Sequence, residues 1–331
     1  DEILSFNGKI YDKAQAEAVI KEETEKLIPN CTTHHRNEVV NKIKVQTYSD
    51  IESFDSDPNI IVIESGVLNL SKLELKPHTP DHLSRVLLPV QYIAPEWEIN
   101  DDTIFEDIEK NLKDTLFWKF LKNSFTVDGK FKKNEFETAL EVSASPIIKH
   151  HIDEKAIMFL GKGDNGKSVL LLLLNSMLGK DNVSNIALQD LVSNPFAAAR
   201  LDGKLANIYT DLKSTALKNE EKSNNLSSGE PMHVEHKYQD GFDMVTYAKL
   251  IFSCNQFPKV YDQSDGFFRR WIIIQFRRKF ALGDPDRDEK LKEKLINNQD
   301  EKNLIFSYLM IMSEKLLRTG KFRYPLGHAE I

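Results

Sequence analysis

The spacing of apolar and polar residues differs between the N-terminal part of the chain and the part after residue 101. In the N-terminal part, apolar side chains recur at helical spacing over residues 12–27, and a second helix is expected over residues 33–46. The stretch IIVIESGVLNLSKLELKPHTP, beginning at residue 60, combines β-branched runs with a glycine turn and a proline exit, which predicts short strands. Asn7-Gly8 lies between apolar and aromatic residues and predicts a hairpin. The polar residues 52–59 are expected to form a linker.

From residue 101 onward the pattern predicts helices first and then a buried sheet. Over residues 101–145 apolar side chains recur at helical spacing, as Phe105, Ile108 and Leu112 do. Four short apolar runs follow, separated by helical or turn-rich segments, which is typical of an α/β domain with a central, mostly parallel sheet. Residues 285–318 are expected to be helical and charged. The four runs are residues 156–160, 205–209, 249–253 and 271–276.

The composition is that of a globular protein and restricts the possible partners. Of 331 residues, 40% are apolar and 29% are charged, which is enough for two or three domains with sizeable cores. The formal net charge is −7, so any contact with nucleic acid must be local rather than spread over a basic surface. Two cysteines, far apart in sequence, argue against a disulfide framework and fit a reducing cytoplasm. We find no signal peptide and no apolar run long enough to cross a membrane, and expect the chain to be a piece of a longer polypeptide.

The segment FLGKGDNGKSVLLLLLNSMLG contains the pattern G-x-x-x-x-G-K-[ST], which binds phosphate in kinases, GTPases, transporters and DNA motors alike. A short apolar strand precedes the loop and a leucine-rich helix follows it, so backbone N–H groups and the helix N-terminus supply a positive field. Lys167 is expected to reach the β- and γ-phosphates, and Ser168 to ligate Mg²⁺. The residues expected to bind ATP are Gly161, Gly163, Asp164, Asn165, Gly166, Lys167 and Ser168.

Two further segments supply polar groups that an ATPase places beside the phosphates. Asp211 comes just past the apolar run 205–209, where it can hold Mg²⁺ and polarise water, although a solvated loop aspartate has the same pattern. Most such sites carry two adjacent acids, whereas Thr210 occupies the first position here. Asn255 ends the strand in AKLIFSCNQFP, where its amide can orient the attacking water or form a turn before Pro258.

Arg269 and Arg270 stand immediately before the apolar run 271–276, in the segment DGFFRRWIIIQF. An arginine at this place can stabilise charge on a transferring phosphoryl group, in its own subunit or in a neighbouring one. The alternative is a pair of surface arginines engaged in ion pairs. Arg270 is the residue expected to act across a subunit boundary, and Arg269 is its competitor for that role.

The order of these elements resembles the superfamily 3 helicases. The loop GKGDNGKS, the strand followed by Asp211, and the segments FSCNQFP and FFRRW are similar to motifs of the phage, plasmid and poxvirus-type primase-helicase branch. Upstream, NGKIYDKAQAEAVIKEE, NEVVNKIKVQTY and GVLNLSKLELKPHTPDHLSRVLLPVQY resemble the accessory domain that precedes the motor in this branch. The resemblance covers most of the chain and points to an archaeal plasmid or virus replication protein. Thr210 departs from the family pattern, which leaves open how the groups at the metal divide their roles.

The resemblance implies a domain organisation and a set of partners. It implies a small α+β accessory domain over residues 1–100, a helical collar over residues 101–150, an AAA+ P-loop motor over residues 151–282 and a helical segment over residues 283–331. It further implies ATP, Mg²⁺, single-stranded or forked DNA, a hexameric ring of identical subunits and a primase-polymerase domain N-terminal to this chain. The expected setting is the cytoplasm of a prokaryotic host or a virus-infected cell, without a membrane.

The segment GEPMHVEHKYQDGFDM resembles the hairpin with which this family lines its pore. It places Lys237 beside His236 and Tyr238, near a turn-prone Gln239-Asp240-Gly241. A basic side chain next to aromatic rings suits a single strand, whose phosphates need charge and whose bases can stack. One such loop from each subunit would form a positive ring within an acidic protein, although an ordinary exposed hairpin has the same pattern.

The sequence therefore predicts an ATP-dependent DNA helicase motor, and two other functions stay open. An origin-binding or packaging ATPase would grip DNA without unwinding it, and a small-molecule kinase would need a lid and an acceptor pocket. The stretch CTTHH, residues 31–35, contains metal-ligand residue types, but no matching second half-site lies nearby in the sequence, so zinc is not expected.

Overall fold

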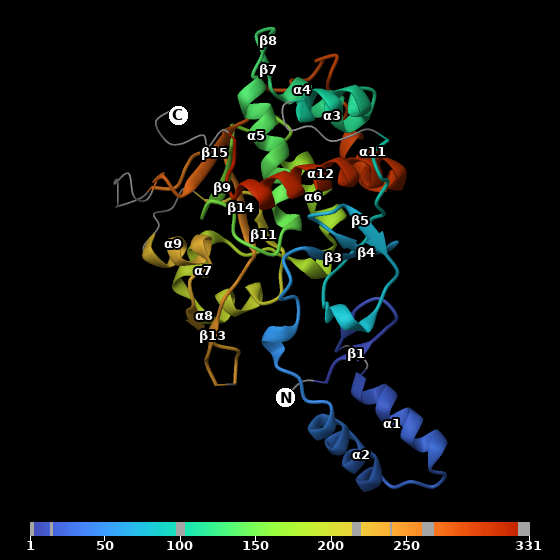
Figure 1. The fold of residues 1–331 in the computed structure, drawn as a ribbon. Helices are drawn as coiled ribbons and strands as arrows, with labels where there is room; N and C mark the ends of the chain where they lie inside the picture. Colours follow the sequence, from blue (N-terminus) through green and yellow to red (C-terminus); the bar gives the residue numbers. More distant parts are fainter. Residues whose placement is uncertain are drawn as a thin grey trace.

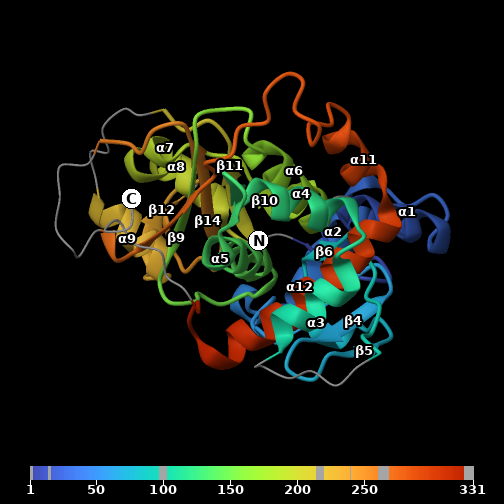
Figure 2. The same ribbon diagram turned by 90° about the horizontal axis from the view of Figure 1, so that it is seen from above.

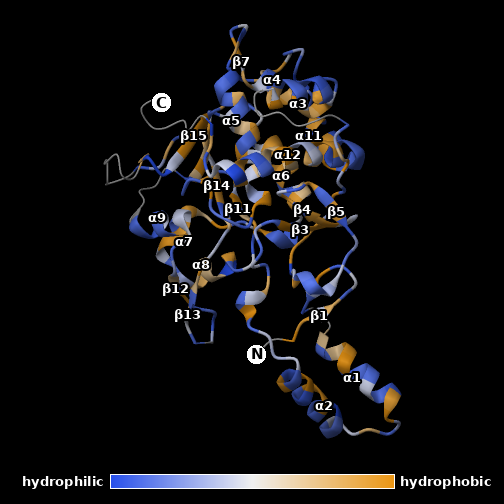
Figure 3. Cartoon of the chain, viewed as in Figure 1, coloured by the Kyte–Doolittle hydropathy of each residue, from blue (hydrophilic) through white to orange (hydrophobic). Residues whose placement is uncertain are grey.

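The chain forms a body around a parallel sheet, from which a smaller N-terminal part and a pair of helices extend (Figure 1). This computed structural model describes residues 3–13, 16–96, 103–213, 220–238, 240–259 and 268–323. Hydrophobic residues concentrate in the central sheet and the helices around it, whereas the tip of the hairpin at β13 is hydrophilic (Figure 3).

The central sheet has five strands, and every neighbouring pair is parallel. The order is β10-β11-β14-β9-β15, so β14 lies between β9 and β11. Four of these strands coincide with the four predicted apolar runs, which confirms the α/β class, whereas β10 has two residues and is too short to predict from the pattern. The bounds are Ala156–Leu160 for β9, Val183–Ser184 for β10, Ala206–Tyr209 for β11, Lys249–Cys254 for β14 and Trp271–Gln275 for β15.

Alternate side chains of the strands enter two separate cores, because successive residues of a strand face opposite sides of a sheet. On β9, Ile157 and Phe159 join one cluster, whereas Ala156 and Met158 join the other. The first cluster packs against α5, α6 and α12, and the second against α7, α8 and α9, on opposite sides of the strands (Figure 2). These helices are Lys133–Ala144 (α5), Lys167–Leu178 (α6), Leu188–Ser193 (α7), Pro195–Ala198 (α8), Glu220–Ser228 (α9) and Gln299–Thr319 (α12).

The C-terminal helices belong to the first core. A helix was expected from residue 285, but the segment up to residue 290 forms turns, and the helices are α11, Leu291–Asn297, and α12. Two charged side chains of α12 have partners inside the protein. Glu301 accepts a hydrogen bond from the backbone N–H of Phe117 (2.8 Å), and Lys315 Nζ lies 3.3 Å from Glu141 Oε1. The predicted charged helix is therefore largely buried.

The predicted helical pattern is confirmed over residues 103–145, with one interruption, and residues 101–102 lie outside the described residues. Helices α3, Ile104–Leu112, and α4, Leu116–Ser124, precede a hairpin of β7, Thr126–Val127, and β8, Lys130–Phe131, before α5 begins. Asp128-Gly129, at the turn, is a strong hairpin signal that the helical spacing of the surrounding residues obscured.

The N-terminal part is a mixture of helices and short strands, as the pattern predicts. Strands β1, Ser5–Phe6, and β2, Tyr11–Asp12, form the expected hairpin, so the following helix begins later than residue 12. The helices are α1, Ala16–Leu27, and α2, Thr33–Gln46, and they project away from the body (Figure 1). A four-stranded sheet follows in the order β5-β4-β3-β6, with bounds Glu74–Lys76, Gly66–Asn69, Ile60–Ile63 and Leu87–Leu88.

The prediction of a polar linker over residues 52–59 is wrong in part. The carboxylate of Asp55 is fully buried and binds Arg85 and Lys149, so this stretch is anchored inside the protein. In CTTHH, the side chain of Thr32 accepts a hydrogen bond from the backbone N–H of His35, and His35 Nδ1 accepts one from Thr32. Thr32 and His35 form a capping box at the start of α2, which gives these two residues a structural role.

Candidate functional site

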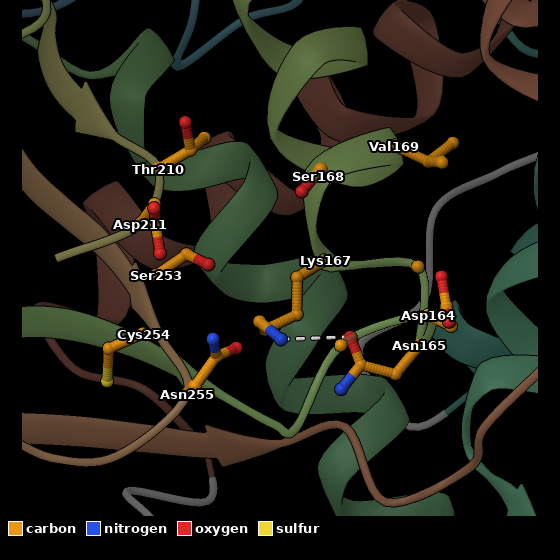
Figure 4. A pocket seen from close by; sticks show the side chains of 12 residues that line it. Asp164, Asn165, Lys167, Ser168, Val169, Thr210, Asp211, Ser253, Cys254 and Asn255 are labelled. Carbon is orange, nitrogen blue, oxygen red and sulfur yellow. Dashed lines mark hydrogen bonds between the residues drawn. The ribbon is translucent and has the colours of Figure 1, made fainter.

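The carboxyl ends of β9, β11 and β14 meet at one edge of the sheet, beside the N-terminus of α6. A cavity of about 360 Å³ opens there (Figure 4). Because β14 lies between the other two strands, residues that are far apart in sequence face one space. The lining residues are Gly163, Asp164, Asn165, Gly166, Lys167, Ser168, Val169, Thr210, Asp211, Ser253, Cys254 and Asn255.

Two glycines of the loop are required by close contacts. Gly166 caps α6 with a φ of 88°, and a Cβ there would lie 2.6 Å from Cε2 of Phe120. A Cβ on Gly161 would lie 2.0 Å from Nδ2 of Asn165. The loop therefore packs closely on its surroundings, and the first turn of α6 points its free N–H groups into the cavity.

Lys167 crosses the loop instead of extending into solvent. Its Nζ donates to the carbonyl oxygen of Gly161 (2.5 Å) and to Oδ1 of Asn165 (2.9 Å). Burial lowers the pKa of this amine, and the nearby Cys254 and Asp211 oppose that effect. A buried cation held by two neutral oxygens, at the positive end of a helix, is an arrangement that favours an anion in the cavity.

Asn165 has a structural role that the sequence did not reveal. Besides accepting from Lys167, it donates through Nδ2 to the carbonyl oxygen of Phe276 (3.0 Å), just past β15. The backbone N–H of Phe280 donates to the carbonyl of Asp164 (2.7 Å), so the loop is tied to the segment after β15 twice. No sequence signal marks this connection, because the partners are separated by more than a hundred residues.

Asp211 and Thr210 lie across the cavity from Ser168 (Figure 4). Asp211 has a left-handed backbone with a φ of 75°, a conformation that aspartate tolerates better than most residues. The next residue, Leu212, donates its N–H to the carbonyl of Ser253 (2.7 Å), which fixes the turn against β14. The carboxylate and the hydroxyls offer the hard oxygen ligands that Mg²⁺ requires.

Asn255 lines the cavity at the end of β14, with its amide directed toward the end of Lys167 (Figure 4). The structure thus places this side chain in the site. Its neighbours Ser253 and Cys254 also line the cavity and were not predicted, although their positions at the end of the same apolar run could have indicated them. Burial raises the pKa of the Cys254 thiol to about 11, so at neutral pH this group is a neutral wall of the cavity.

Neither of the two predicted arginines lines the cavity of its own chain. Arg270 Nη1 lies 3.3 Å from Oε2 of Glu154 and 3.4 Å from the carbonyl oxygen of Asn224. Because Arg270 precedes β15, it lies at the amino ends of the strands, opposite the cavity. Arg269 is exposed, and its carbonyl oxygen accepts a hydrogen bond from Lys155. The roles of the arginines therefore stay predictions, and a role within the same subunit finds no support in this arrangement.

The predicted DNA-contact residues lie on a hairpin remote from the cavity. Strands β12, Met232–Val234, and β13, Phe242–Met244, pair antiparallel and carry a protruding loop (Figure 1). Lys237 and Tyr238 are exposed at its tip, and His236 stacks on Phe242 with ring centroids 5.3 Å apart. Gln239 lies outside the described residues. The hairpin prediction is confirmed as structure, and DNA contact stays a prediction.

None of the helices in the described part of the chain combines the length and the apolar character needed to span a bilayer. Two family profiles match the sequence. Residues 1–126 match the family described as D5 N terminal like, and residues 159–270 match a family of unknown function, DUF5906. The second match contains the loop, Asp211, Asn255 and both arginines, so the cavity coincides with a unit shared among other proteins.

Among curated protein sequences, the chain is similar to a protein named "Putative helicase 121R" of Invertebrate iridescent virus 3. The two are 26% identical over 262 residues, which is 75% of this chain and 26% of that protein. This chain thus spans about a quarter of its viral relative.

Among solved structures, the fold is similar to the apo structure of the NrS-1 C-terminal region. One such structure covers 96% of this chain and 69% of its own, with a TM-score of 0.52 and 16% identity. A second, the A form of the apo structure, covers 88% and 67%, with a TM-score of 0.51 and 16% identity. At this level of identity the likeness concerns the fold, and it extends over both the N-terminal part and the sheet.

Proposed function

We propose that the chain is the ATP-driven motor of a replication primase-helicase, an AAA+ protein of superfamily 3 that moves along single-stranded DNA as a ring. The observation that carries the proposal is the cavity, which gathers Lys167 and Ser168, Asp211 and Asn255 from the ends of three adjacent strands. These are the groups that phosphoryl transfer from ATP to water requires. The D5 N terminal like match and the viral relative named as a helicase support the same direction.

ATP fits the site by charge and by hydrogen-bond donors. The loop offers its backbone N–H groups and the N-terminus of α6 to the phosphates. Lys167 is already inside the site, so reaching a phosphate requires exchange of its two neutral oxygen partners for charged ones. Charge-assisted hydrogen bonds are the stronger kind, so this exchange favours the bound state.

Ser168 and Asp211 would hold Mg²⁺, which supplies positive charge that neutralises the phosphates. Thr210 lines the same cavity and offers a hydroxyl where the family pattern has the first of its two acids. Asp211 is then the residue that draws the proton from the attacking water, and the amide of Asn255 orients that water. Both act from fixed backbone positions at strand ends, as positioning for catalysis requires.

An arginine from the neighbouring subunit completes the site in this proposal. Arg270 and Arg269 lie outside their own cavity, and a ring of identical subunits, hexameric by the family resemblance, would carry one of them to the next subunit's phosphates. Such an arginine is typically worth about 10³–10⁵ in turnover. ATP turnover should therefore rise with protein concentration as the ring assembles.

DNA would pass the hairpin tips. Lys237 supplies a charge for phosphates, while His236 and Tyr238 supply rings on which bases can stack. In the full-length protein, a primase-polymerase domain N-terminal to this chain would begin the strands that the motor exposes. The setting would be the cytoplasm of a prokaryotic host or of a virus-infected cell, during replication of a plasmid or a virus.

The test measures ATP turnover with and without single-stranded DNA, and then strand displacement on a forked duplex. The proposal expects turnover that DNA stimulates, and unwinding that requires ATP. Stimulated turnover without displacement would replace the helicase with a DNA-gripping initiator or packaging ATPase. ATP turnover that DNA leaves unchanged but that a small hydroxyl compound stimulates would indicate a kinase.

A further inference from the structure

The ring of His151 lies between the residues that precede β12 and the residues that follow β13. Gly229 stands just before β12, and a Cβ on it would lie 2.4 Å from His151 Cδ2. Thr246 stands just after β13, and its carbonyl oxygen accepts a hydrogen bond from His151 Nε2 (2.6 Å). One side chain therefore contacts the chain where it enters the hairpin and where it leaves it.

A second contact connects the segment that carries His151 to the residues that follow β13. Lys249, the first residue of β14, donates through its fully buried Nζ to the carbonyl oxygens of Ile148 (2.7 Å) and Tyr247 (2.9 Å). Residues 148–151 and 246–249 are thus joined by two hydrogen bonds, and the one from Lys249 to Ile148 is buried. Since β14 ends at the cavity, Lys249 lies about 20 Å from Asn255 along one strand.

The same segment is fastened to the N-terminal part by a buried charge cluster. Lys149 Nζ lies 3.4 Å from Oδ1 of Asp55, and both side chains are almost completely buried. Asp55 also binds Nε of Arg85 (3.0 Å) and the hydroxyl of Ser84 (2.9 Å). Arg85 in turn approaches Asp202 of the sheet domain (4.0 Å). A carboxylate with this many partners holds one geometry, because a buried charge that loses a partner is strongly disfavoured.

We propose that residues 148–151 are a rigid joint between the N-terminal part and the base of the hairpin, with His151 as the residue that positions the hairpin for DNA. This inference rests on the proposed function, since it assigns the hairpin's mechanical connection. The joint makes the N-terminal part move with the hairpin when DNA pulls on its tip. A change in DNA binding at the hairpin is then transmitted to the N-terminal part, and a change in the N-terminal part is transmitted to the hairpin.

A matched pair of glycine substitutions tests the joint. Gly229→Ala pushes a methyl group into His151, whereas Gly320→Ala meets nothing within 4 Å, and the two glycines have nearly the same φ, 72° and 69°. The backbone strain of adding a side chain is therefore equal, and the clash is the difference. For Gly229→Ala we expect the DNA concentration for half-maximal stimulation of ATP turnover to rise about two- to thirtyfold, the usual range for coupling residues. Turnover without DNA should match that of Gly320→Ala.

Hydrogen exchange gives a readout that does not depend on DNA. In Gly229→Ala, peptides covering residues 230–249 should exchange faster than in Gly320→Ala, while the loop over residues 161–168 keeps its rate. Asp55→Asn removes the charge and keeps the shape of the side chain. If the joint transmits this change, hydrogen exchange at residues 245–249 should also become faster. Exchange that changes only around residues 84–88 in Asp55→Asn would overturn the joint.

The two levels of the proposal fail in different ways. If the unmodified protein shows no response to DNA, the proposed function fails, while the exchange experiment still decides whether the joint exists. If DNA stimulates the protein and Gly229→Ala behaves as Gly320→Ala in both assays, the role of His151 is refuted although the motor stands.

Discussion

Lys167 and Lys249 lie near opposite ends of the central sheet and are held in the same way. Each places a buried ammonium group on two neutral oxygens, Gly161 O and Asn165 Oδ1 for Lys167, and Ile148 O and Tyr247 O for Lys249. Burial lowers both pKa values, that of Lys249 to about 7. The difference is access. Lys167 lines an open cavity of about 360 Å³, whereas Lys249 is sealed between two backbone segments.

The comparison teaches that a buried lysine acquires a chemical role from the space beside it. At the cavity edge, a phosphate can replace the neutral oxygens and repay the burial of the charge. At the sealed end nothing can enter, so the same contacts serve only to join two segments. Substitutions at the two lysines should accordingly affect activity in one case and stability in the other.

The largest effect is expected for Lys167→Ala. Without the amine, the phosphates lose their principal cation, and ATP turnover should fall by at least about 10²-fold. The measurement is steady-state phosphate release at saturating ATP. Since Lys167 faces a cavity, thermal stability without nucleotide should change little. A variant that turns over ATP normally would mean that the cavity is not the ATP site.

Asp211→Asn should separate binding from chemistry at the same edge. The amide keeps the shape of the side chain and removes the charge that accepts a proton. We expect hydrolysis to fall by about 10²–10⁴, the usual contribution of a general base, while nucleotide affinity persists. Fluorescent-nucleotide titration and turnover assays together measure the two quantities. Wild-type hydrolysis would place the catalytic carboxylate elsewhere, and a gain in turnover in Thr210→Asp would show that the missing first acid limits the rate.

Lys249→Met should lower stability instead of activity. The methionine leaves the carbonyls of Ile148 and Tyr247 without a donor, which costs about 1–3 kcal/mol, and the loss should be clearest at pH 9, where burial of the amine is penalised less than at pH 7. The folded-state pKa of about 7 lies below the ordinary 10.5, so the unfolded chain binds more protons between those values, and stability should rise with pH from 7 toward 10. Urea unfolding at pH 7 and pH 9 measures this rise, which the methionine variant should lack. An equal change in the free energy of unfolding between pH 7 and pH 9 in both proteins would mean that Lys249 titrates normally.

His151→Gln should have the smallest effect on stability and a characteristic pH dependence. Burial, followed by the charge of Lys249, lowers the pKa of His151 from 6.5 to about 4. The native state is therefore penalised as pH falls from 6.5 toward 4, because the unfolded chain takes up the proton first. Between pH 6.5 and pH 5.5 this amounts to about 1 kcal/mol. Urea unfolding should show this loss in the unmodified protein and a smaller one in the glutamine variant, and identical losses would contradict the lowered pKa of His151.

The loop, its helix and the strands around it follow from the sequence because their causes are local. Gly161–Lys167 must turn tightly, α6 must start at the turn, and the apolar runs must be buried strands, whatever lies elsewhere in the chain. The α/β class follows from the same runs. The positions of Asp211 and Asn255 at strand ends are also local, so their approach to the loop could be predicted once parallel strands were assumed.

Only the tertiary structure decided the remaining contacts. The hydrogen bond from Asn165 to Phe276 joins residues that are 111 positions apart in sequence, and the pair of Asp55 and Lys149 joins residues that are 94 positions apart. Asp55 lies in a stretch so polar that its sequence predicts a solvated linker, and its burial depends on cations brought to it by other elements. Hydrophobic periodicity reports which face of an element is buried but not against what. The partner of a buried charge is fixed by strand order and packing, which no local pattern encodes.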